Sequence, residues 1–125
     1  MMSPGMKKYP EHKLRTQRIE GKVEVYLAGE QIARTENAIR LLEEGHEPVI
    51  YIPKNDLINI DLRKFDDYMC PYKGHAELYS IIHNEQEFVD SAFSFDRPFD
   101  EFQDLTGRVA FYPDKVEEIR ISELQ

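Results

Sequence analysis

The feature that most constrains the fold is a series of short segments in which apolar and polar side chains alternate. In residues 23–27, for example, Val23, Val25 and Leu27 are separated by single polar or aromatic residues. This period of two places the apolar side chains on one face of a strand. Similar runs recur down the chain, bounded by Gly, Pro, Asn or Asp. The segments predicted as strands are 22–27, 32–35, 49–52, 58–62, 76–82, 87–95, 109–112 and 116–121. The expected fold class is therefore mainly β with minor α, in a compact antiparallel arrangement.

One or two short helices are expected beside these strands. Residues 36–44 carry apolar side chains at helical spacing, Thr35 is placed to cap the first turn, and Gly45 is placed to end it. A second helical turn is expected after Asp96. It carries apolar side chains at Phe99, Phe102 and Leu105.

The chain is expected to form one domain with a short lead-in. A length of 125 residues is enough for a single hydrophobic core. Residues 1–18 are polar and contain Pro4, Gly5 and Pro10 without any periodicity, which predicts a flexible lead-in. Residues 19–125 are then the domain, with 64–67 as a polar connection inside it.

The charge balance and the cysteine count limit the possible partners and compartment. The chain has 16 basic and 24 acidic residues and a net charge of −8, which disfavours nucleic acid as a partner. The basic residues near the start are interrupted by Glu11 and Glu20. No apolar run reaches the roughly 20 residues of a membrane helix. A single cysteine, Cys70, fits a reducing compartment. The expectation is a cytoplasmic protein without membrane association, and its oligomeric state is left open.

The richest chemistry lies in the segment 69–74, Met-Cys-Pro-Tyr-Lys-Gly. Cys70 is a candidate nucleophile if a nearby cation lowers its thiol pKa, although a lone cysteine is more often a small buried apolar residue. Lys73 can present its charge to a phosphate or carboxylate, while Gly74 allows the backbone a close approach. Tyr72 adds an aromatic wall. The segment therefore predicts a site for a small anionic or nucleotide-like ligand.

Other residues are weaker candidates for the same site. Arg40 is a possible second cation, and Tyr51 is one of many aromatic residues that can line a ligand pocket as well as a core. His75 and Glu77 share one face of a predicted strand and could join Cys70 at a metal. Paired cysteines of the zinc type are absent, so no metal and no cofactor are predicted.

Four segments together resemble a known bacterial family, the domain of unknown function 427. They occur in the family's order and span roughly residues 22–119: Thr35-x-x-Ala38 with Leu41, Tyr51-Ile52-Pro53 with Leu57 and Asp61-Leu62, Cys70-Pro71-Tyr72-Lys73-Gly74 with Ala76 and Tyr79, and Gly107-Arg108-Val109-Ala110-Phe111-Tyr112. The sequence departs from the family pattern at Phe93 and Phe95, where the family usually has Trp and Tyr. Their N–H and O–H donors are lost here, which implies a different ligand if those donors contact one in relatives.

The resemblance implies a tent-like β fold shared with methionine sulfoxide reductase B and Mss4. The family is sometimes labelled a nucleotidyltransferase, although no paired-carboxylate metal motif stands out in this chain. Fold alone does not fix function. Three hypotheses therefore stay open: a domain that binds a small anionic ligand at 69–74, a non-catalytic structural or interaction module, and a nucleotidyltransferase. The residues leave open whether the domain is an enzyme.

Overall fold

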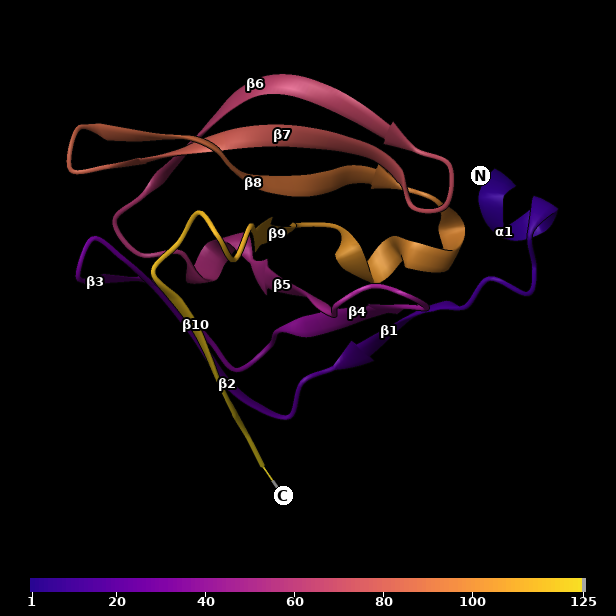
Figure 1. The fold of residues 1–125 in the computed structure, drawn as a ribbon, viewed down its shortest axis with the longest axis horizontal. Helices are drawn as coiled ribbons and strands as arrows, with labels where there is room; N and C mark the ends of the chain where they lie inside the picture. Colours follow the sequence, from indigo (N-terminus) through magenta and orange to yellow (C-terminus); the bar gives the residue numbers. More distant parts are fainter. Residues whose placement is uncertain (125) are drawn as a thin grey trace.

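A computed structural model describes residues 1–124 as two antiparallel sheets with short helices (Figure 1). The larger sheet has seven strands in the order β1-β4-β5-β9-β8-β7-β6, and the smaller has three in the order β10-β2-β3. The strands of the larger sheet are β1 (Leu14–Arg18), β4 (Ile39–Glu43), β5 (Val49–Pro53), β6 (Asp61–Cys70), β7 (Gly74–His83), β8 (Gln86–Pro98) and β9 (Arg108–Phe111). Those of the smaller sheet are β2 (Gly21–Leu27), β3 (Glu30–Thr35) and β10 (Glu118–Glu123).

The helices are all short. They are α1 (Pro4–Lys8) and the 3-10 helices η1 (Lys54–Asp56) and η2 (Asp100–Leu105). None of the helices in the described part of the chain is long and apolar enough to cross a membrane. In Figure 1, β2 and β10 run steeply across the direction of β6, β7 and β8, so the two sheets meet at an angle. The mainly β, antiparallel class predicted from the sequence is confirmed.

The central strands of the larger sheet are buried on both faces, and each face has its own core. Along β5 and β9, successive side chains alternate between the two cores: Tyr51 and Ala110 belong to one, Ile52 and Val109 to the other. The smaller sheet covers the core that contains Ile52 and Val109, with Val23, Val25 and Ile32 among others. The helix η2 covers the core that contains Tyr51 and Ala110, with Phe102 and Leu105. Central strands covered on both sides are nearly continuous apolar runs, as in 49–52.

The helix predicted over 36–44 is wrong, because this segment contains the strand β4. Ile39 and Leu41 are buried in one core, while the intervening Arg40 points to the other side. In so short a segment the spacing of apolar residues fits both periods, and pairing with β1 and β5 decides between them. The Thr35 hydroxyl accepts a hydrogen bond from the Asn37 N–H at 2.9 Å, which closes a local turn and caps no helix.

Three smaller expectations also differ from the structure. The connection predicted at 64–67 is part of β6, and its polarity reflects an exposed edge strand with an irregular register between Lys64 and Asp66. Asp96 lies in β8, and η2 begins only at Asp100. The segment 1–18, expected as a flexible lead-in, forms α1 and then β1, which pairs with β4. The division of the chain into a lead-in and a domain at residue 19 stays a prediction.

Candidate functional site

The segment 69–74 forms the turn between β6 and β7. Cys70 ends β6 and pairs with Gly74, the first residue of β7. The Pro71 carbonyl accepts a hydrogen bond from the Gly5 N–H at 2.7 Å, which docks α1 against the turn. Gly74 has a φ of +117°, and a Cβ there would lie 2.6 Å from the Arg97 carbonyl oxygen. Only glycine fits this place, so part of the motif serves to fold the turn.

A cavity of about 460 Å³ lies beside this turn. Its volume falls in the range of roughly 300–1,000 Å³ that is typical of small-molecule sites. The sequence-predicted residues Cys70, Tyr72 and Lys73 line it together. The other side of the cavity is supplied by the end of β4 and the start of β5. The complete lining is Leu41, Glu43, His46, Glu47, Val49, Tyr68, Cys70, Pro71, Tyr72 and Lys73.

Lys73 is held in the wall of this cavity with an incomplete set of partners. Its side chain is only 16% exposed, and its ammonium lies 5.4 Å from the centre of the Phe95 ring. The nearest carboxylate oxygen is Glu43 Oε1 at 3.8 Å, which is too long for a hydrogen bond. Glu43 is therefore an ion-pair neighbour of Lys73 that makes no short hydrogen bond with its ammonium. A partly buried cation with so long a carboxylate contact is suited to receive an anion.

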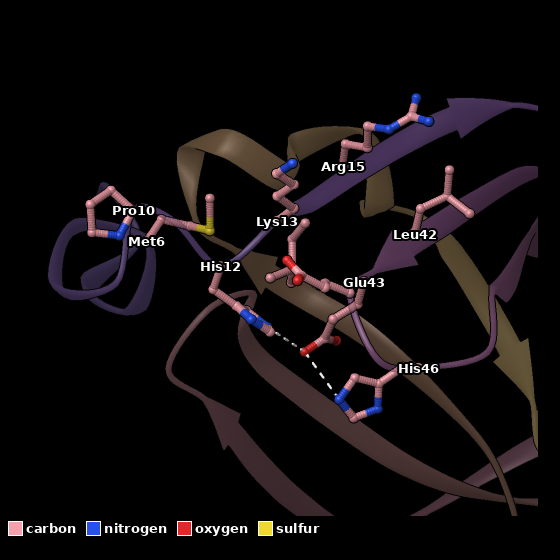
Figure 2. A pocket seen from close by; sticks show the side chains of 10 residues that line it. Met6, Pro10, His12, Lys13, Arg15, Leu42, Glu43 and His46 are labelled. Atoms are coloured by element: carbon pink, nitrogen blue, oxygen red, sulfur yellow. Dashed lines mark hydrogen bonds and ion pairs between the residues drawn. The ribbon is translucent and has the colours of Figure 1, made fainter.

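Glu43 is the centre of a cluster that the sequence did not indicate. His12 Nε2 lies 3.1 Å from Glu43 Oε2, and His46 Nε2 lies 3.6 Å from the same oxygen. Figure 2 shows the Glu43 carboxylate between the two rings. His12 also packs on Tyr72, with 4.9 Å between ring centres. We call His12, Glu43, His46 and Lys73 the cavity cluster.

The cavity cluster borders a second hollow as well. A cavity of about 530 Å³ shares Glu43 and His46 with the first and adds His12, Lys13 and Arg15 (Figure 2). It lies at the end of the β1–β4 pair. A ligand bound in either cavity therefore meets the same carboxylate and the same imidazole.

Two further predicted residues, Cys70 and Tyr51, are buried, and of these only Cys70 lines the cavity. Cys70 is 7% exposed and forms part of the core, although it also contributes to the lining. Tyr51 is fully buried, and its hydroxyl has no hydrogen-bond partner among residues 1–124. Burial raises the pKa of Tyr51 well above its ordinary value, and nearby Cys70 and Glu43 add to this effect. The Tyr51 hydroxyl is thus a neutral donor close to two residues that line the cavity.

Arg40 does not lie with these residues. It forms ion-pair and hydrogen-bond contacts with Glu123 and Gln17, and it lines a separate hollow of about 700 Å³ between β4 and β10. Neighbouring side chains of β4 point to opposite faces, so Arg40 and Glu43 cannot share a site. Had 39–43 been interpreted as a strand, the shared parity of Leu41 and Glu43 would have placed Glu43 inward. No local signal connects His12 or His46 to Glu43.

The residues that depart from the family pattern lie around the site. The Phe93 ring packs edge-on against Tyr51, with 5.9 Å between ring centres, and against Phe95 at 6.0 Å. Phe95 in turn lies beneath the Lys73 ammonium. The two phenylalanines therefore form an apolar floor under the tyrosine and the lysine, without donors of their own.

A second histidine cluster lies on the other face of the larger sheet. His75 Nδ1 lies 2.7 Å from Asp96 Oδ1, and its Nε2 lies 3.1 Å from Asp67 Oδ1. Lys64 contacts Asp67 at 2.9 Å and Glu77 at 3.1 Å. We call these five residues the sheet-face cluster. Among residues 1–124, no group of three His, Cys, Asp or Glu side chains is arranged to hold a metal ion.

The fold and the site define a small antiparallel β domain with a ligand-sized cavity at the β6–β7 turn. Comparison with family models gives a match over residues 15–122 to the family described as a domain of unknown function (DUF427), with the short name NTP_transf_9. The chain belongs to this family, as its motifs implied. A search of curated proteins gives no match.

Proposed function

We propose that this domain binds a small anionic or nucleotide-like ligand in the cavity beside the 69–74 turn. Lys73 supplies the charge, Tyr72 an aromatic wall, and Tyr51 a neutral donor at the base. Gly74 holds the turn in shape. The observation that carries the proposal is the Lys73 side chain, which is 16% exposed in the cavity wall and lies 3.8 Å from the Glu43 carboxylate, too far for a hydrogen bond. Anions are the ligands that satisfy such a group.

A thermal-shift screen over nucleotides and acidic metabolites tests this proposal. At least one ligand is expected to raise the melting temperature of the wild-type chain and not that of Lys73→Ala. A ligand at about 100 times its Kd stabilises the folded state by about 2.7 kcal/mol. Lys64→Ala is the matched control, since Lys64 is a cation already paired with two carboxylates. If no ligand stabilises the wild type more than Lys73→Ala, the proposal is wrong.

A non-catalytic structural module is the second candidate. The contacts of Pro71 with Gly5 and of Gly74 with Arg97 support it, because they explain the motif by folding alone. The labelling rate of Cys70 with a fluorescent iodoacetamide separates the two. A thiol that reacts faster in the folded chain than in the unfolded chain favours a working site, and an unreactive thiol favours the module.

Nucleotidyl transfer is the third candidate, and only the family's short name supports it. It requires a nucleoside triphosphate and magnesium to bind together. Calorimetry of the wild-type chain with both present tests this, and the absence of binding removes the candidate.

A further inference from the structure

Glu43 is one carboxylate contacted by three nitrogen-bearing side chains from separate parts of the chain. His12 precedes β1, His46 follows β4, and Lys73 lies in the β6–β7 turn. Two of the three lie near Oε2 and the third near Oε1. The Glu43 side chain is 18% exposed, so this arrangement is partly shielded from water. Glu43 thus occupies the position that the anionic group of a ligand would take.

The hold of Glu43 on Lys73 is weak compared with the same type of contact elsewhere in the chain. Lys64 lies within 3.1 Å of two carboxylates, whereas Lys73 lies 3.8 Å from one. At the longer distance the Lys73 ammonium makes no hydrogen bond with the Glu43 carboxylate. An incoming anion therefore gains hydrogen bonds that Glu43 does not make.

We infer that His12, His46 and Lys73 form a subsite for the phosphoryl group of a phosphate monoester, and that Glu43 occupies this subsite when no ligand is bound. This inference rests on the proposed function and narrows its ligand to one class. A phosphate monoester carries up to two negative charges and three terminal oxygens, so it reaches several donors at once. A ligand carboxylate would make only the contacts with these three side chains that the Glu43 carboxylate already makes. The body of the ligand lies against Leu41, Val49 and Tyr72 in the cavity of about 460 Å³.

Glu43 then acts as an internal competitor. Its charge repels the phosphoryl group at short range, and its carboxylate must leave Lys73 before the phosphoryl group can bind. Neutralising Glu43 removes the repulsion and the need to displace a charged group, and it leaves His12, His46 and Lys73 in place. We therefore predict that replacing this carboxylate strengthens ligand binding.

Isothermal titration calorimetry of the full chain with inorganic phosphate tests this directly. Glu43→Gln is expected to bind phosphate about tenfold more tightly than the wild type, the effect of removing one nearby charge. Glu44→Gln is the matched control, because it removes the same charge one residue away, at a side chain that lines the neighbouring hollow but not the cavity beside the turn, and that forms no ion pair within residues 1–124. Lys73→Ala and His12→Gln, each combined with Glu43→Gln, are expected to lose most of the gain. Acetate is expected to bind none of the variants.

Three outcomes would overturn the inference. The first is equal phosphate affinity in Glu43→Gln and Glu44→Gln, which would show that the change in affinity comes from the net charge of the protein alone. The second is weaker binding by Glu43→Gln, which would make Glu43 a positioning residue. The third is acetate binding as tight as phosphate binding. If the ligand screen finds an acidic metabolite that depends on Lys73 while phosphate fails here, the proposed function stands and this inference falls. If neither experiment gives binding that depends on Lys73, both are wrong.

Discussion

The cavity cluster and the sheet-face cluster are built from the same residue types and lie on opposite faces of one sheet, yet their balance of donors and acceptors differs. In the cavity cluster, two histidines and a lysine share the single carboxylate of Glu43. In the sheet-face cluster, one histidine and one lysine share three carboxylates, those of Asp67, Glu77 and Asp96.

This difference shows which cluster can take an added anion. In a chain with a net charge of −8, most cations are expected to be neutralised by nearby acids. The sheet-face cluster follows that pattern, since Lys64 lies within 3.1 Å of two carboxylates and Asp96 also contacts Arg97. The cavity cluster has more donors than acceptors and lies between two hollows. A histidine beside a carboxylate is therefore not enough to indicate a ligand site. The balance of nearby charges and the volume of the adjacent cavity determine whether an added anion can bind.

Gly74 joins the two clusters, because Lys73 precedes it and His75 follows it. Gly74→Ala is expected to disrupt both and to destabilise the fold by about 3 kcal/mol or more, since the left-handed φ is strained and the atoms near the new Cβ are backbone atoms. Urea unfolding measures this change. Gly29→Ala is the control: its φ is also positive, at +79°, but no atom lies within 4 Å of its Cβ position, so a loss of about 1 kcal/mol is expected. Equal losses in the two variants would show that crowding at Gly74 plays no part.

Tyr51, which lies near Cys70 and Glu43 without lining the cavity, is expected to lower stability. The unpartnered Tyr51 hydroxyl is buried, and such a group costs roughly 1–3 kcal/mol. Tyr51→Phe is therefore expected to raise the free energy of unfolding by about 1 kcal/mol in urea. The same variant is expected to lose ligand stabilisation in the thermal-shift screen. A variant that is less stable than the wild type would mean that the hydroxyl has a partner and is no spare donor.

The sequence predicted the turn side of this site and missed the opposite wall for a physical reason. Cys70, Tyr72 and Lys73 are adjacent in the chain, so their chemistry was visible as one motif. Glu43 lies in the segment 36–44, which was predicted as a helix because the spacing of Ala38 and Leu41 fits a helix in isolation. What makes 39–43 a strand is its pairing with β1 and β5, and β1 lies in a segment that carries no periodic signal.

The same pairing explains why the histidines could not be predicted. His12 reaches Glu43 because the Lys13 carbonyl accepts the Glu44 N–H at 3.0 Å, at the end of the β1–β4 pair. His46 reaches it through the turn after β4. Both distances depend on a strand pair between distant segments, which no local pattern encodes. The strands of the β7–β8 hairpin, by contrast, carry their own alternation and turn residues and were predicted within a few residues.

The smallest expected effect tests the sheet-face cluster, which should act on stability and not on ligands. The hydrogen bond from Lys64, helped by the Lys64 and His75 charges, holds the pKa of Asp67 below its ordinary value. A carboxyl whose pKa is lowered by folding stabilises the native state above its unfolded pKa, and this contribution is lost as the pH falls through the lower, folded value. Asp67→Asn is therefore expected to reduce stability slightly at neutral pH and to flatten its decline in acid. Denaturation in urea between pH 7 and pH 2 measures this, with Asp61→Asn as a control in the same strand. Ligand stabilisation should be unchanged in Asp67→Asn, and a loss of it there would mean that the two clusters are not separate in function.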